Sequence, residues 1–462
     1  ASFIEAFLFL NYVMKNIPKY KGGSFFLGPV SEFLDHNQFD FFKKLGSKGN
    51  ILKFRAGLGS IIFIADPKYI KHILQGNYKN YKKDYFYKDL SLALGSGLVT
   101  SEGKYWKKQR KLSQPAFHKK SIDNFSEIMK EEALLTITKW NSLENNNINL
   151  LQEMKEVTMS IVSRCLFDID IKRNAKELSN AIDGVLEYLD NRMNTIIRIP
   201  GRPILPTSNY KNFKNNLKII KETFIEIINA KRKNIEEPYD LLDMLILAQD
   251  EDTGEGMSNE QLVDEIITLF VAGHETTATT MTWFYYSLNK FQGINKNFYH
   301  QLSSLNDVNQ LQVSDILSFD YIHLLVQEVM RFYPTVWGVG RESVNEDNLF
   351  GYKISKGETI TIPILYMHHH PEYWDSPDQF NPERFRDVDV EKDLKWIYMP
   401  FGEGPRKCIG NNFAMLEIFI LATMFSKEFN IHIENIDDIK FHNGITSKPQ
   451  KDIFARIEKN KF

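Results

Sequence analysis

The most informative stretch of the sequence is Phe401-Gly402-Glu403-Gly404-Pro405-Arg406-Lys407-Cys408-Ile409-Gly410. Three glycines and a proline surround one cysteine, and an apolar segment that predicts a helix, Ala414–Phe425, follows. Glycine permits backbone conformations and close approaches that a Cβ atom would block. The N–H groups at a helix start and the neighbouring cations, Arg406 and Lys407, favour a thiolate at Cys408. The stretch therefore predicts a shielded loop that presents a cysteine sulfur.

A thiolate in such a loop can ligate iron, and a single thiolate is one of the recognised proximal ligands of haem. The alternative for a lone cysteine is a buried structural thiol in a Gly-rich turn. The second cysteine, Cys165, lies in an apolar segment and is interpreted as a core thiol. Two cysteines exclude a disulfide-stapled scaffold and a four-cysteine zinc site.

The composition is that of a large globular protein. The chain has 462 residues, of which 43% are hydrophobic and 25% charged, and its formal charge is 57 − 59 = −2. These values exclude a largely disordered chain and a basic nucleic-acid-binding protein. Because no long linker divides the sequence, we expect a single domain over residues 1–462, with residues 1–19 as a lead segment and no fused reductase.

The clearest predicted helix lies in the middle of the chain. Ser258 and Gln261 form a capping-box pattern, and apolar residues then recur at helical spacing as far as Leu288. This helix of about 30 residues is longer than most. Its middle carries the polar cluster His274–Thr277. Polar groups inside a buried helix are costly unless they are paired or functional.

The other patterns predict a mainly α protein with a minor β portion. A hairpin is expected over Ile51–Ala56 and Ile61–Ala65, and a short strand over Thr359–Ile362. Residues 104–300 are mostly helical in pattern, a further helix is expected near 315–332, and a Pro-rich meander precedes the cysteine loop.

The pattern F-x-x-G-x-R-x-C-x-G resembles the haem-binding loop of the cytochrome P-450 family. Four further motifs match in the family's order, and the resemblance spans roughly residues 20–457. They are the E-x-x-R pattern of Glu328 and Arg331, the P-E-R-F pattern at Pro382–Phe385, the oxygen-binding pattern Ala272-Gly273-His274-Glu275-Thr276-Thr277, and the W-x-x-x-R pattern of Trp106 and Arg110.

The resemblance implies a mainly α fold with a long central helix that crosses a haem b, and small antiparallel sheets near the N-terminal part and in the last third. It implies that Cys408 is the axial ligand, whose electron donation favours O–O cleavage. Thr276 and Glu275 match the family's alcohol–acid pair, which delivers protons to bound oxygen. The alternative for Thr276 is a hydroxyl that bonds the carbonyl one turn back. Ala272 and Gly273 leave room for O₂ and substrate.

Other site residues follow from the resemblance alone. The haem propionates would bind Trp106, Arg110, Arg341 and Arg406. Phe401 would pack near the sulfur, and Gly402 and Gly410 complete the loop around the cofactor. Glu328, Arg331 and Arg384 would form a structural cluster that holds the meander and the cysteine loop.

The substrate pocket is expected to be apolar. The resemblance implies a lining from the loop before Trp106, the central helix at Ala272, and the turn after Pro334; the remaining candidates are Leu90, Leu94, Val99, Val336, Trp337 and Gly338. Such a pocket favours a lipophilic substrate, either a fatty acid, a terpenoid or a steroid. The motifs look closest to the fatty-acid and microsomal-like branch, but no arginine stands in the Ile61–Ala65 strand to hold a carboxylate.

Electrons would come from NAD(P)H through a separate flavoprotein reductase or ferredoxin, because the chain has no flavin or iron–sulfur motif. Six lysines near the Trp106–Arg110 helix could form a docking patch, with an ordinary solvated face as the alternative: Lys104, Lys107, Lys108, Lys111, Lys119 and Lys120. We expect a cytoplasmic monomer, with peripheral membrane contact through Phe3, Phe7, Leu8 and Leu10 as an alternative, or through an anchor removed from the chain.

The leading hypothesis is an O₂-dependent monooxygenase. A peroxide-driven peroxygenase or haem isomerase on the same fold is the second reading, and a haem-binding sensor or carrier is the third. The intact Glu275–Thr276 pair favours the first reading.

Overall fold

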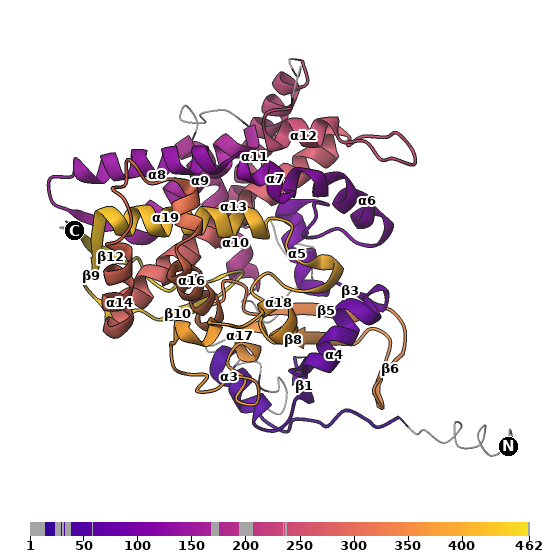
Figure 1. Ribbon diagram of the computed structural model, residues 1–462. Coiled ribbons are helices and arrows are strands. Elements are labelled where there is room, and N and C mark those ends of the chain that lie inside the picture. The colour runs from indigo at the N-terminus through magenta and orange to yellow at the C-terminus, as the bar shows by residue number, and fades with distance from the viewer. Residues whose placement is uncertain are drawn as a thin grey trace, which may run out of the picture.

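The computed structural model describes residues 14–23, 29, 32, 38–57, 59–167, 175–193, 207–233, 235 and 238–460. A large helical body and a smaller part containing the main sheet lie side by side (Figure 1). Each part has its own hydrophobic core. The mainly α fold with minor sheets predicted from the sequence is confirmed.

The main sheet has five strands in the order β1-β2-β8-β5-β3. Strands β1 and β2 form the predicted hairpin, in which Ile51 pairs with Ile64, and β2 and β8 are the one parallel pair among these five strands. The bounds of the five strands are Ile51–Ala56 for β1, Gly59–Ile64 for β2, Thr359–Ile362 for β8, Val339–Ser343 for β5 and Tyr81–Lys82 for β3.

The central helix α13 (Asn259–Lys290) has 32 residues, and its start shows the predicted capping box of Ser258 and Gln261. All residues from Thr277 to Leu288 are buried, which is typical of a helix enclosed on every side. The helices packed around it are α9 (Leu150–Phe167), α11 (Ser208–Lys231), α16 (Asp320–Phe332) and α19 (Asn411–Glu428) (Figure 1). Helix α19 begins three residues after Cys408, so it joins the cysteine loop directly to α13.

The remaining α-helices are mostly short. They are α3 (Gln38–Gly46), α4 (Pro67–Lys71), α5 (Tyr85–Leu94), α6 (Gly103–Ser113), α7 (Lys119–Asp123), α8 (Ser126–Asn141), α10 (Ala175–Met193), α12 (Leu241–Leu247), α14 (Gln292–Leu302), α15 (Val313–Leu317), α17 (Ile364–Met367) and α18 (Val390–Asp393). The helix expected near 315–332 is two helices, α15 and α16. The chain between them, at Ser318 and Phe319, forms no helix.

Three small sheets complete the fold. Their strands are β4 (Asn147–Asn149) with β12 (Phe454–Lys459) and β9 (Phe429–Ile433), β6 (Asp347–Leu349) with β7 (Tyr352–Ile354), and β10 (Phe441–Asn443) with β11 (Ser447–Pro449). Single turns of other helix types lie at His72–Gly76, Tyr78–Asn80, Gln114–Phe117, Pro382–Phe385, Gly404–Arg406 and Ile436–Asp438.

Across the parts of the chain that the structure describes, no helix combines the length and the apolar character needed to cross a membrane. The lead-segment residues Phe3, Phe7, Leu8 and Leu10 lie outside the described residues.

Candidate active site

The cysteine loop is a tight structure closed by backbone hydrogen bonds. The N–H of Cys408 donates to the carbonyl of Phe401 at 2.9 Å. Gly402 and Gly404 have φ angles of 67° and 76°, in the left-handed region that favours glycine. A Cβ atom at Gly404 would lie 2.2 Å from the carbonyl oxygen of Leu74, so this glycine is also needed for close packing.

Cys408 lines a cavity of about 320 Å³, and its side chain is exposed to that cavity. Burial raises the pKa of the thiol, and the N–H of Gly410 and the Arg110 guanidinium oppose this increase. Both groups stabilise negative charge on the sulfur, so they favour the thiolate form that would bind a metal ion. In the described part of the chain, no group of His, Cys, Asp and Glu residues forms a metal site of its own.

Most of the predicted site residues lie around this one cavity. They come from the cysteine loop, helix α6, strand β5, helix α13 and the segments on either side: Phe401, Gly402, Arg406, Cys408, Gly410, Trp106, Arg110, Arg341, Ala272, Gly273, Thr276, Val99 and Val336.

One side of the cavity carries a group of cations. The Arg406 guanidinium lies 3.8 Å from the centre of the Trp106 ring. Burial, together with the charge of Arg341, lowers the pKa of Arg406 to about 10, although Glu102 opposes this. Burial and repulsion from Arg406 and Arg341 also hold the pKa of Lys83 well below its usual range. Crowded buried cations are stabilised by an anionic ligand.

These residues fit a haem group. The cation group suits its two carboxylates, the Cys408 thiol suits its iron, and apolar side chains form much of the remaining wall.

Thr276 and Glu275 point in different directions. The Thr276 hydroxyl lies at the cavity and donates to the carbonyl of Ala272 at 2.7 Å, which is the helical bond considered as its alternative role. The Glu275 side chain is buried, and its carboxylate accepts from the Thr446 hydroxyl at 3.2 Å. The Lys448 ammonium lies 3.6 Å from the same oxygen. Glu275 therefore faces the β10–β11 hairpin and is not part of the cavity wall.

A family model described as Cytochrome P450 matches residues 18–455. The chain belongs to the cytochrome P450 family. It is accordingly a monooxygenase that depends on haem iron, O₂ and reducing equivalents.

Several curated proteins are similar to this P450. It is 28% identical to LUTEIN DEFICIENT 5 of Arabidopsis thaliana, over 86% of this chain and 70% of that protein. It is 27% identical to pentalenene oxygenase of Streptomyces avermitilis, over 87% of this chain and 88% of the relative. It is 25% identical to cyclooctat-9-en-7-ol 5-monooxygenase of Streptomyces melanosporofaciens, over 84% of each chain.

Four predicted pocket residues of this P450 do not line the cavity. Leu90 and Leu94 are buried in the core between helices. Trp337 stacks on Phe42 with ring centres 6.1 Å apart, and its indole N–H donates to the carbonyl of Gly444 at 2.8 Å. Gly338 packs against the Ile362 carbonyl. Leu90 and Leu94 lie on the face of helix α5 that is turned into the core, whereas Trp337 and Gly338 precede strand β5 and are held by the contacts just described, away from the wall that Val99 and Val336 join.

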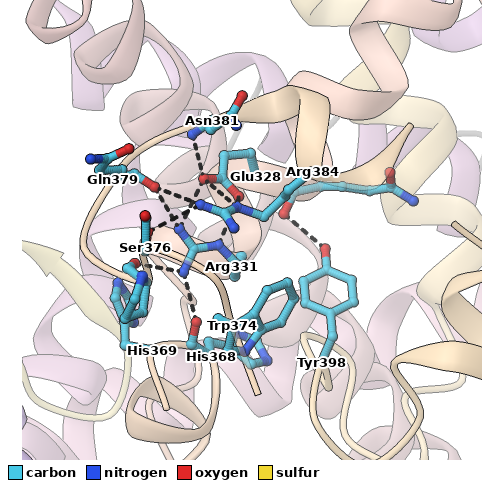
Figure 2. A network of polar contacts seen from close by, with 12 residues as sticks. Glu328, Arg331, His368, His369, Trp374, Ser376, Gln379, Asn381, Arg384 and Tyr398 are labelled. Atoms are coloured by element: carbon cyan, nitrogen blue, oxygen red, sulfur yellow. Dashed lines mark hydrogen bonds and ion pairs between the residues drawn. The ribbon is translucent and has the colours of Figure 1, made fainter. Parts of the chain in front are cut away.

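The predicted structural cluster is assembled in full (Figure 2). Arg331 donates to both carboxylate oxygens of Glu328, at 2.7 and 2.9 Å, and Arg384 donates to Glu328 at 3.2 Å. The Arg331 guanidinium also donates to the carbonyl of His368 at 2.7 Å, and the His368 ring accepts from the N–H of Met399 at 2.8 Å. This chain of bonds connects α16 to the segment just before the cysteine loop.

Sequence patterns did not identify three polar residues near the cavity. Lys83 lies in a lysine-rich stretch with no motif, Glu265 follows Asp264 near the start of α13 with no motif around it, and Thr446 lies in a hairpin turn. Only the three-dimensional fold brings them to the site, so no local signal could have found them.

Proposed function

We propose that this P450 inserts one atom of O₂ into a neutral, terpenoid-like small molecule, with haem b as cofactor and NAD(P)H-derived electrons supplied by a separate redox protein. The observation that carries this proposal is the composition of the cavity wall. The charged residues among the described lining belong to the cation group and the cysteine loop: Lys83, Arg110, Arg341, Glu403, Arg406 and Lys407.

The rest of the described lining is almost entirely apolar, with Val162, Leu166, Leu269, Ile362 and Ile364 as examples. An apolar wall binds a substrate mainly through burial of apolar surface. Because this part of the wall offers no cation for a carboxylate, it favours a neutral hydrocarbon or alcohol over a fatty acid. Two relatives are named for terpenoid substrates, pentalenene and cyclooctat-9-en-7-ol, which supports the same class.

In this proposal the cation group binds the haem carboxylates and Cys408 supplies the axial sulfur. When bound, the haem supplies the iron chemistry that activates O₂. Phe401, Gly402 and Gly410 shape the loop around the sulfur, and they exclude water from it. Ala272 and Gly273 have small side chains at the cavity wall, which leaves room beside α13 for O₂ and substrate.

Protons are delivered by Thr276 and Glu275. The Thr276 hydroxyl is the group at the cavity, and rotation about its side chain would release the bond to Ala272 and let the hydroxyl donate a proton into the cavity. Glu275 lies on the preceding position of α13, and its contacts with Thr446 and the partly exposed Lys448 connect it toward solvent. Glu275 would therefore take up a proton on the hairpin side and return it toward the Thr276 hydroxyl.

The lysines of α6 and α7 would receive the acidic redox partner, but they are not equivalent. Lys108 pairs with Glu255 at 2.7 Å, and Lys111 pairs with Glu251 at 3.0 Å. Lys107 is exposed and has no ion pair among the described residues. Unpaired cations attract an acidic surface more strongly, so Lys104, Lys107, Lys119 and Lys120 would contribute most.

The proposal is tested by turnover with a fifteen-carbon terpene, its alcohol and a twelve-carbon fatty acid. The holoenzyme is supplied either with a reductase, NADPH and ¹⁸O₂, or with hydrogen peroxide alone. We expect ¹⁸O in the product of the terpene or its alcohol only with the reductase system. Turnover on peroxide alone would favour the peroxygenase reading. No turnover under either condition, with haem bound, would favour a sensor or carrier, and preference for the fatty acid would refute the substrate class.

A further inference from the structure

The segment between α5 and α6, residues 95–102, forms one wall of the cavity. Its side chains Leu98 and Val99 line the cavity directly. The segment has no regular helix or strand of its own, so its position depends on the bonds that attach it to its neighbours.

One attachment is to helix α13. Asp264 accepts from the N–H of Ser96 at 2.7 Å, and Glu265 accepts from the N–H of Leu98 at 2.9 Å. Two consecutive carboxylates on the helix therefore hold two alternate amides of the segment.

Two glycines allow this close approach. A Cβ atom at Gly95 would lie 2.1 Å from a carboxylate oxygen of Asp264, and one at Gly97 would lie 2.0 Å from the hydroxyl of Thr268. Both separations are shorter than real Cβ contacts, so the segment lies this close to α13 only because both positions are glycine. Any residue other than glycine would push the segment away from α13.

The opposite edge of the segment is attached to the cation group. The Lys83 ammonium donates to the carbonyls of Leu98, at 3.0 Å, and Val99. Arg406 donates to the Ser101 carbonyl at 2.8 Å. The segment is thus held between the residues that would bind the haem carboxylates and the helix that carries Thr276.

Among these anchors, Glu265 is the most deeply buried acid. It is 1% exposed, and its second carboxylate oxygen, Oε1, has no hydrogen-bond partner. Burial raises its pKa to about 7; the Leu98 N–H lowers it, Asp264 raises it and Lys83 lowers it. Tyr105 is the other titratable group beside it.

We propose that Glu265 is a positioning residue of the substrate cavity, which seats segment 95–102 against α13 and thereby fixes the wall formed by Leu98 and Val99. The proposal depends on the proposed function only in assuming that the cavity receives the substrate. Asp264 also holds the segment, but of these two carboxylates Glu265 is the one that binds the backbone of a lining residue, Leu98.

This role makes opening of the segment dependent on pH. With the segment seated, burial raises the pKa of the Glu265 carboxyl to about 7, and we expect solvent access in an open state to return it toward the ordinary value of 4.5. The ionised group therefore favours the open state. With these two pKa values, the ratio of open to seated segment should rise about tenfold between pH 6 and pH 8.

The test is amide hydrogen–deuterium exchange of residues 95–102 in the haem-loaded full chain, with each rate divided by that of an unstructured peptide. The wild type should show the tenfold increase from pH 6 to pH 8. Glu265→Gln keeps a carbonyl acceptor for Leu98 but cannot ionise, so its normalised exchange should stay constant with pH. Glu265→Leu removes the acceptor and should raise exchange at pH 6 by about threefold to tenfold. Glu260→Ala, an exposed acid on the same helix, is the matched control and should match the wild type.

A second readout connects the segment to the cavity. Clotrimazole is bulky enough to touch the wall, whereas imidazole is not. Optical titration should show that Glu265→Leu weakens clotrimazole binding about threefold or more and leaves imidazole binding within twofold.

A wild type without pH dependence, or a Glu265→Gln variant that retains it, would overturn the proposal. Clotrimazole affinity equal to that of the wild type in a folded Glu265→Leu protein would also overturn it. If Glu265→Leu does not fold, the comparison between wild type and Glu265→Gln decides alone. Because neither readout requires turnover, failure of the terpenoid proposal is recognised separately.

Discussion

Replacing Glu328 with glutamine should destabilise the protein severely. Glu328 is fully buried and accepts from Arg331 at 2.7 and 2.9 Å, from the N–H of Asn381 at 2.7 Å and from Arg384 at 3.2 Å. The substitution removes the negative charge that compensates a fully buried guanidinium, and it places an amide donor against other donors. Removal of one partner of a buried ion pair costs about 3–5 kcal/mol of unfolding free energy.

The assay is urea unfolding of the haem-loaded protein, followed by far-ultraviolet circular dichroism and by the carbon-monoxide spectrum of the reduced protein. We expect the spectrum to change at lower urea than the helical signal, because Arg331 and His368 connect the cluster to the cysteine loop. Glu383→Gln is the matched control.

Glu383 is the neighbour of Arg384 on the short 3₁₀ turn Pro382–Phe385, but it is exposed and pairs with the exposed Arg386. Its replacement should cost no more than about 1 kcal/mol. A loss below 1 kcal/mol for Glu328→Gln, or equal losses for the two variants, would refute the reasoning.

Three further predictions follow from the site and its surface. Thr276→Val should leave haem binding unchanged but lower product formation roughly 10²-fold while reductant is still consumed. The assay compares the amount of product with the amount of NADPH oxidised, and a wild-type ratio of product to NADPH would contradict the proton-delivery role. Because the pKa of Glu265 is higher in the folded state, the wild type should lose stability relative to Glu265→Gln as pH rises from 4.5 to about 7, by on the order of 3 kcal/mol. Thermal melts across this pH range measure the difference, and a difference that stays constant would contradict the prediction. Reduction by an acidic reductase, measured by stopped flow, should slow more in Lys107→Glu than in Lys111→Glu, because Lys111 is already paired with Glu251. Equal reduction rates in both variants and the wild type would count against the docking surface.

The sequence was sufficient for the parts of the fold that local patterns determine. The hairpin of β1 and β2 follows from alternation and from β-branched residues, and the start of α13 follows from its capping box. The Glu328–Arg331–Arg384 cluster was predicted from two motifs, and the structure brings all three side chains together.

The sequence was insufficient where a position depends on rotation of an element or on distant packing. Leu90 and Leu94 were expected in the loop before Trp106, but they lie on helix α5, whose rotation turns them into the core. The direction of Glu275 is set by Thr446 and Lys448, which are more than 170 residues away in the chain. Glu265 gains its role only because the backbone of segment 95–102 comes within hydrogen-bond distance of α13.

The central claim is that Cys408 is the axial ligand of a haem bound in this cavity. The most direct measurement is the optical spectrum of the dithionite-reduced, carbon-monoxide-bound protein, recorded for the wild type, Cys408→Ser and Cys165→Ala. Cys165 is a fully buried core thiol and serves as the matched control. We expect a strongly red-shifted Soret band in the wild type and in Cys165→Ala, and its loss in Cys408→Ser. A folded wild type without haem, or a red-shifted band that persists in Cys408→Ser, would contradict the claim.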